Sequence, residues 1–126
     1  MTRQEIATMI AGVGLPYAYD HFDEIEAPGG PPFIVFYYPD SDDFMADDTN
    51  YATIAQLVIE LYTDNVDFAK EAAVEAALRS ASLPFRRQQT WIDSERMYQT
   101  AYATTVLLTD DPDDAGDGEQ DNEKEV

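Results

Sequence analysis

The residues best suited to acid–base chemistry gather around the only histidine of the chain, His21. Asp20 and Asp23 flank it, and Ser41 supplies a hydroxyl farther along the chain. A serine becomes a nucleophile only when a base is held beside it, and this spacing does not fix Ser41 near His21. We therefore interpret His21 as a surface or strand-edge residue rather than as a catalytic base.

Three other groups could in principle bind an ion, bind a phosphate or cleave a glycoside. The acids of residues 40–43 suit calcium, yet Phe44 and Met45 stand where an EF-hand needs an oxygen ligand and a glycine; a solvated loop fits better, with weak divalent binding as the alternative. Residues 29–32 read Gly-Gly-Pro-Pro, which lacks the spacing and lysine of a phosphate-binding loop. Pairs such as Asp23 and Glu24 arise by chance among 26 acids. The sequence thus predicts no catalytic residue, no metal site and no cofactor, hence no enzyme.

The charge of the chain limits the partners it can bind. Its 26 acids and seven lysines and arginines give a formal net charge of -19. Residues 110–126 hold nine of the acids and one lysine, a charge of -8, which leaves -11 for residues 1–109. Proteins that grip DNA, RNA or anionic membranes neutralise phosphates with basic side chains, so this charge argues against all three.

Composition also bears on size and compartment. A length of 126 residues suits one domain, and we expect a single α+β domain at 1–109 and a disordered acidic tail at 110–126. The lack of cysteine fits a reducing cytoplasm. Gly12 and Gly14 interrupt the apolar N-terminal stretch, so we expect no signal peptide, and no segment has the roughly 18–20 apolar residues of a membrane span. The sequence therefore predicts a cytoplasmic product with no membrane partner.

A first helix is predicted at the N-terminus. Thr2 and Glu5 form a capping box, in which each side chain accepts a hydrogen bond from the other residue's backbone N–H. The helix should run to about Ala11, and Gly12 or Gly14 can supply its left-handed cap. Its apolar positions recur at intervals of three and four and predict one buried stripe: Ile6, Met9, Ile10 and Val13.

A second helix is predicted at residues 66–81, capped by Asp64 or Asn65. Its apolar side should pack on the sheet through Phe68, Ala72, Ala76 and Leu78. Its charged residues cluster on the opposite side: Asp67, Lys70, Glu71, Glu75 and Arg79.

Alternating and β-branched runs predict five strands, at residues 17–22, 33–38, 51–63, 85–93 and 98–108. Residues 33–38 are apolar on both alternating faces, which indicates a strand covered on both sides. A loop at 39–50 makes a long hairpin with an acidic tip. The order α-β-β-β-α-β-β predicts an α+β fold with two helices packed on a mostly antiparallel sheet.

Two apolar features exceed what two short helices can cover. Phe44 and Met45 form an apolar pair in a charged loop, so they must fold back on their own sheet or meet a partner. Five large aromatic residues add to the strand at 33–38: Tyr51, Tyr62, Trp91, Tyr98 and Tyr102. Core packing accounts for part of this surface, and a subunit interface, where tyrosine and tryptophan are enriched, would account for the rest.

Several local motifs occur in a familiar order over residues 1–108. After the opening helix they are GLPYAY at 14–19, HF at 21–22, PPFIV at 31–35, FMADD at 44–48 leading to Tyr51, VIELYTD at 58–64 and SERMYQT at 94–100. In these motifs the chain resembles the tail terminator, or tail completion, proteins of long-tailed, non-contractile bacteriophages and prophages. The acidic tail lies outside the resemblance.

The resemblance implies a structural virion protein in the tail or neck, assembled in the host cytoplasm. Such a protein forms a homo-oligomer, typically a hexameric ring, that caps the tail tube protein and meets the head-side connector protein. DNA passes through the lumen without specific binding, and a negative lumen would let it slide. A closed head-to-tail ring would also bury two-faced apolar strands.

The same resemblance assigns candidate interface residues. The hairpin tip would touch the tube or a neighbouring subunit through Phe44, Met45, Asp47, Asp48 and Tyr51. Three arginines would pair with acidic patches on adjacent subunits, or merely balance local charge: Arg86, Arg87 and Arg96. Trp91 and Tyr98 are aromatic candidates for the same interface. The alternative function is an acidic DNA mimic or other binding module that acts on a basic partner.

Overall fold

The computed structural model describes residues 1–23, 27–39, 41–44 and 52–109. The predicted tail at 110–126 lies outside this part of the chain, so its predicted disorder stays a prediction. The helices and strands are α1 Arg3–Ala11, β1 Tyr17–Tyr19, β2 Phe33–Tyr37, β3 Ser41–Phe44, β4 Ala52–Thr63, α2 Phe68–Ser80, β5 Arg86–Ile92 and β6 Met97–Leu108.

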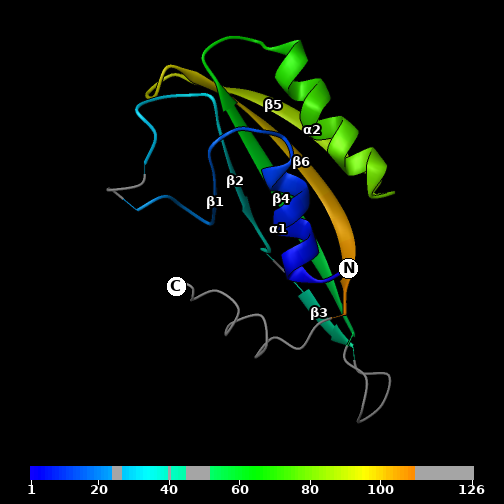
Figure 1. Ribbon diagram of the computed structural model, residues 1–126. Helices are drawn as coiled ribbons and strands as arrows, with labels where there is room; N and C mark the ends of the chain where they lie inside the picture. The colour runs from blue at the N-terminus through cyan, green and yellow to red at the C-terminus, as the bar shows by residue number, and fades with distance from the viewer. Residues whose placement is uncertain (24–26, 40, 45–51, 110–126) are drawn as a thin grey trace.

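The strands form one sheet in the order β1-β2-β4-β6-β5, with β3 paired to β4 beyond the end of β2. Only β1 and β2 are parallel, and every other pair is antiparallel. The two helices lie side by side on the same face of the sheet (Figure 1). The predicted α+β class, with two helices on a mostly antiparallel sheet, is confirmed, and the structure adds the short strand β3 inside the segment predicted as loop.

The two 12-residue strands β4 and β6 form the centre of the sheet and pair along almost their whole length, from Thr53 with Leu108 to Thr63 with Tyr98. The predicted alternation in β4 is confirmed, because Leu57, Ile59 and Leu61 are buried on one face. The first predicted strand is shorter than expected. It ends at Tyr19, since the next residue, Asp20, has a φ of 69° that breaks the extended backbone.

Helix α1 forms as its capping signals predict. The Thr2 hydroxyl accepts a hydrogen bond from the Glu5 N–H at 3.0 Å, and the Glu5 carboxylate accepts one from the Thr2 N–H at 2.8 Å. Ile6 and Ile10 are buried. The residue with left-handed geometry is Gly14, with a φ of 91°, whereas Gly12 stays helical.

Helix α2 differs from its prediction in start and in orientation. Asp67 caps it, accepting a hydrogen bond from the Lys70 N–H at 3.1 Å, in place of Asp64 or Asn65. The face packed on the sheet consists of Glu71, Val74 and Leu78. The predicted packing residues Phe68, Ala72 and Ala76 are exposed instead. The prediction failed because it assigned Glu71 to solvent on account of its charge.

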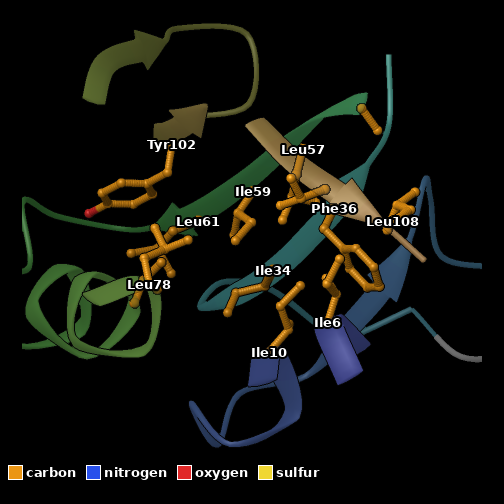
Figure 2. Packing of buried hydrophobic residues seen from close by; sticks show 13 residues of the cluster. Ile6, Ile10, Ile34, Phe36, Leu57, Ile59, Leu61, Leu78, Tyr102 and Leu108 are labelled. Carbon is orange, nitrogen blue, oxygen red and sulfur yellow. The ribbon is translucent and has the colours of Figure 1, made fainter. Parts of the chain in front are cut away.

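The hydrophobic core lies between the helices and the sheet. Figure 2 shows Ile6 and Ile10 of α1 directed toward Ile34 and Phe36 of β2, while Leu78 of α2 lies near Leu61 of β4. The chain ends of the domain also meet at this layer. The Met1 amino group donates a hydrogen bond to the Leu107 carbonyl at 2.9 Å.

Candidate functional site

The face of the sheet opposite the helices is one candidate surface. Within the described residues no helix covers it (Figure 1), yet Val35 on this second face of β2 is only 9% exposed, in line with the predicted cover on both sides of the strand. Strand alternation and register place on this open face the side chains of Phe33, Val35, Tyr37, Ile54, Gln56, Val58, Glu60, Tyr62, Gln99, Ala101, Ala103, Thr105 and Leu107. Leu107 is 49% exposed and Ile54 43% exposed, so an apolar end of this face meets solvent.

A hydrogen-bonded network occupies the other end of the open face. The Tyr37 and Tyr62 hydroxyls both donate to the Glu60 carboxylate, at 2.8 and 2.7 Å. The Gln99 amide donates to the Tyr62 hydroxyl at 2.9 Å. Phe33 stacks on Tyr62 with ring centroids 4.9 Å apart. This network gives the open face an ordered polar region of fixed geometry.

The network raises the pKa of both tyrosines. The hydrogen bond to Glu60 is the main cause for Tyr37 and raises its pKa to about 12. Burial is the main cause for Tyr62 and also raises its pKa to about 12. At ordinary pH both tyrosines therefore stay protonated and donate hydrogen bonds to the Glu60 carboxylate. A protonated tyrosine cannot act as a general base.

Arg86 and Arg87, adjacent in sequence, have different environments. Arg87 lies on the helix side of β5 and binds Glu71 through a hydrogen-bonded ion pair, with a second contact to Glu75 at 3.5 Å. Its guanidinium thus compensates acids of its own chain. Arg86 is exposed on the open face and forms no ion pair with the residues that the structure describes. Of these two predicted interface arginines, Arg86 is the one available to a partner.

A shallow hollow of about 590 Å³ begins beside Arg86. It is lined by Gln56, Pro84, Phe85, Arg86, Ala103, Thr104 and Thr105. β5 starts at Arg86, opposite Ala103, while β6 continues to Leu108, so the hollow lies where β6 extends past its neighbour. Arg86 is the only ionisable side chain in this lining, which provides no acid–base pair for a reaction.

The predicted aromatic and basic residues at the turn between β5 and β6 come together. Trp91 and Tyr98 pack with ring centroids 4.9 Å apart, and the Arg96 guanidinium lies 5.5 Å from the Trp91 ring centre. The Trp91 indole N–H donates to Asp93 at 3.3 Å. Trp91 is still 39% exposed, so this cluster forms an aromatic corner at the edge of the sheet.

The predicted hairpin tip is described only in part. Phe44 belongs to β3, where its backbone is in register with Ala52. Met45, Asp47, Asp48 and Tyr51 lie outside the described residues, and their role as contacts stays a prediction.

Sequence reasoning missed two exposed tyrosines at the opposite edge of the sheet. Tyr17 is 41% and Tyr19 54% exposed on the helix side of β1. Both rings contact Phe36, at centroid distances of 6.5 and 5.4 Å. The alternation Tyr-Ala-Tyr indicated that both tyrosines lie on one face of a strand. Their exposure depends on β1 being an outer strand, which is determined by long-range strand pairing.

His21 is a surface residue, as the sequence predicted, and 70% of its side chain is exposed. Its ring lies 2.8 Å from Asp20 and 3.8 Å from Asp23, and the hydrogen bond to Asp20 raises its pKa. Among the described residues there is no group of three or more metal-ligand side chains. The same part of the chain contains no helix long and apolar enough to span a membrane.

Comparison with known proteins identifies the fold. No family model and no curated protein matches this sequence. Among solved structures, a chain of the virion of a native gene transfer agent particle is similar, with a TM-score of 0.51 and 20% sequence identity. The similarity covers 82% of this chain and 86% of that one. The two chains therefore share one overall fold, and at 20% identity the similarity establishes the fold alone.

Proposed function

We propose that the chain is a structural protein of a phage-like virion and acts as a tail terminator, forming a ring that caps the tail tube and joins it to the head-side connector. The observation that carries this proposal is the fold shared with a chain of a gene transfer agent virion over most of both chains. The resemblance of residues 1–108 to tail terminators, which rests on local motifs, points in the same direction.

The surface of the domain supports an assembly role. One whole face of the sheet carries no helix in the described residues and ends in the exposed Leu107 and Ile54. Its central positions include Ala101 and Ala103, whose small side chains allow another backbone to approach closely. A face of this kind is suited to contact with another protein of the assembly rather than to binding a small molecule.

The charge supports the passage of DNA. A ring built from copies that each carry a charge of -19 presents many carboxylates and few cations to a phosphate backbone. Repulsion at short range prevents the DNA from adhering to the wall of such a ring.

The proposal is tested in two steps. The mass of the purified chain is measured by light scattering at several concentrations, alone and with the tail tube protein from the same genome. We expect a closed oligomer to form in at least one of these conditions. The gene is then deleted, and electron microscopy of the particles is expected to show tails of uncontrolled length that fail to join heads.

The same measurements separate the alternative function. A DNA mimic would stay a single copy of 14.1 kDa and bind a basic DNA-binding protein one to one, with an affinity that falls steeply as salt is added. Normal tails in the deletion strain, together with a monomeric protein, would reject the tail terminator proposal.

A further inference from the structure

The outer strands of the sheet are β1 and β5, and within the described residues no further strand pairs with either of them. β1 lies at one end of the strand order and β5 at the other. Pro16 and Asp20 bond to β2: the Pro16 carbonyl accepts from the Ile34 N–H, and the Asp20 N–H donates to the Phe36 carbonyl. By alternation, Tyr17 directs its backbone groups away from the sheet, as does the Tyr19 N–H, while the Tyr19 carbonyl accepts from the His21 N–H at 2.7 Å. Alternate residues of the seven-residue β5 direct their backbone groups away from the sheet at the other edge. Unpaired edges of this kind add a strand readily.

Exposed aromatic side chains occur at both edges and on the same face. Tyr17 and Tyr19 are in register with Ile34 and Phe36, which face the core, so these tyrosines lie on the helix side. Trp91 is in register with Tyr98, two residues along β6 from the buried Thr100 of the core side. All three aromatics would therefore lie on one continuous face if β5 of one copy paired with β1 of the next.

The direction of the strands determines how the two edges would meet. Following the pairings across the sheet, β1 and β5 run in opposite directions. If copies are related head to tail with their helices on the same side of the sheet, β5 of one copy and β1 of the next meet as an antiparallel pair. When Trp91 of one copy lies opposite Tyr17 of the next, the residues that follow β1 in the second copy run alongside the start of β5 in the first.

Charge agrees with this alignment. The residues after β1 include Asp20 and Asp23, both exposed. The start of β5 carries Arg86, which is exposed and forms no ion pair among the described residues. The antiparallel alignment places this basic end of one copy against the acidic end of the next.

We propose that copies of this chain join head to tail by antiparallel pairing of the β5 edge with the β1 edge of the next copy, burying Trp91 against Tyr17 and Tyr19. This contact specifies how the ring of the proposed function is built and rests on that function. It requires one continuous sheet across subunits, with the helices of all copies on the same side.

Introduced cysteines test the contact, because the natural chain has none. Three full-length variants are prepared under conditions in which the protein assembles: Tyr17→Cys, Tyr19→Cys and Trp91→Cys. Mild oxidation of Trp91→Cys mixed with Tyr17→Cys should give disulfide-linked dimers, the diagonal pair of Trp91→Cys with Tyr19→Cys should link less, and each variant alone should give none. A disulfide needs Cβ atoms about 3.5–4.5 Å apart, so the result reports close pairing.

Phe68→Cys is the matched control. Phe68 is 76% exposed, more than any of the three aromatics, and it belongs to α2 rather than to either edge strand. Mixed with Tyr19→Cys, it should give no dimer above the level produced by random collision. Efficient linkage of this pair, or of Trp91→Cys with itself, would overturn the proposed pairing.

Serine variants supply a readout independent of disulfide geometry. Trp91→Ser should lower the fraction of assembled protein at a given concentration and raise the fraction with a mass of 14.1 kDa, whereas Phe68→Ser should leave both unchanged, with circular dichroism showing both variants folded. If the ring persists in Trp91→Ser and the cysteine variants form no mixed disulfide, this contact is wrong, but the proposed function is not contradicted. Failure of the natural chain to assemble, even with tube protein, rejects both.

Discussion

Glu71 of α2 lies against the helix side of the sheet and Glu60 of β4 lies on the open face, and these two carboxylates differ in how their charge is stabilised. On the helix side, Glu71 is 3% exposed and accepts from the Arg87 guanidinium and, at 2.9 Å, from the Gln89 amide. On the open face, Glu60 is partly exposed and accepts from two neutral tyrosine hydroxyls.

The difference follows from burial. A carboxylate beneath a helix loses nearly all its water and requires a cation to remain charged. A carboxylate on the open face keeps some water, so hydroxyl donors suffice and leave the surface without a positive charge. The helix side is therefore built for stability, whereas the open face is ordered but still available to a partner.

The strongest test of this contrast compares the same substitution on the two faces. Leu57→Ala, in the core, should lower the free energy of unfolding by about 2–5 kcal/mol, because it leaves a cavity. Leu107→Ala, on the open face, should change it by less than about 0.5 kcal/mol. Urea unfolding followed by circular dichroism measures both. Similar losses for the two variants would mean that the open face is packed in the isolated protein.

A smaller effect is expected from removing the cation beside Glu71. Arg87→Met should cost about 2 kcal/mol, less than the about 3–5 kcal/mol typical of fully buried pairs, because Arg87 is 38% exposed. The control is Arg79→Met, whose pair with Glu75 is at the surface and should contribute about 0.5 kcal/mol or less. Equal costs in urea unfolding would contradict the assigned role of Arg87.

On the open face, Glu60→Gln should cost only about 0.5–1.5 kcal/mol. The amide keeps one oxygen that can accept from a tyrosine hydroxyl, while its nitrogen leaves the second hydroxyl without an acceptor. The same variant should lower the pKa of Tyr37, since its hydrogen bond to Glu60 is the main cause of the raised value. An absorbance titration of tyrosinate would detect this shift, and an unchanged titration would show that Glu60 does not hold the hydroxyl.

The last effect is absent at neutral pH and is confined to alkaline solution. Tyr37 and Tyr62 have folded-state pKa values of about 12, above the ordinary value of 10. A raised pKa favours the protonated group in the folded state, so this stabilisation is complete below pH 10 and is lost as pH rises through about 12. Unfolding midpoints of the natural chain should fall over this range more than those of a Tyr37→Phe, Tyr62→Phe variant. Parallel curves would exclude the two hydroxyls as the cause.

Local signals predicted much of the fold. The capping box of Thr2 and Glu5 specified the start of α1, and the alternation around Ile59 specified the buried face of β4. These features depend on neighbouring residues alone. The two-helix α+β class followed from the order of such elements.

Features that depend on long-range pairing were not predictable in the same way. Glu71 faces the sheet because β5 brings Arg87 to it, and no local pattern encodes that meeting. Exposure of Tyr17 and Tyr19 likewise depends on the position of β1 at the end of the strand order. Of the predicted interface residues, Trp91, Tyr98 and Arg96 come together at one corner, while Arg87 is engaged by acids of its own chain.

The brevity of β1 has a consequence for how copies would associate. Three residues can exchange only a few backbone hydrogen bonds with a neighbour, so a single junction would be short-lived. Closing a circle adds a final junction between ends that are already tethered, without a further loss of translational freedom. Intermediates would thus be scarce compared with separate molecules and finished circles, and a docking platform that concentrates the molecules would shift that balance sharply toward completion.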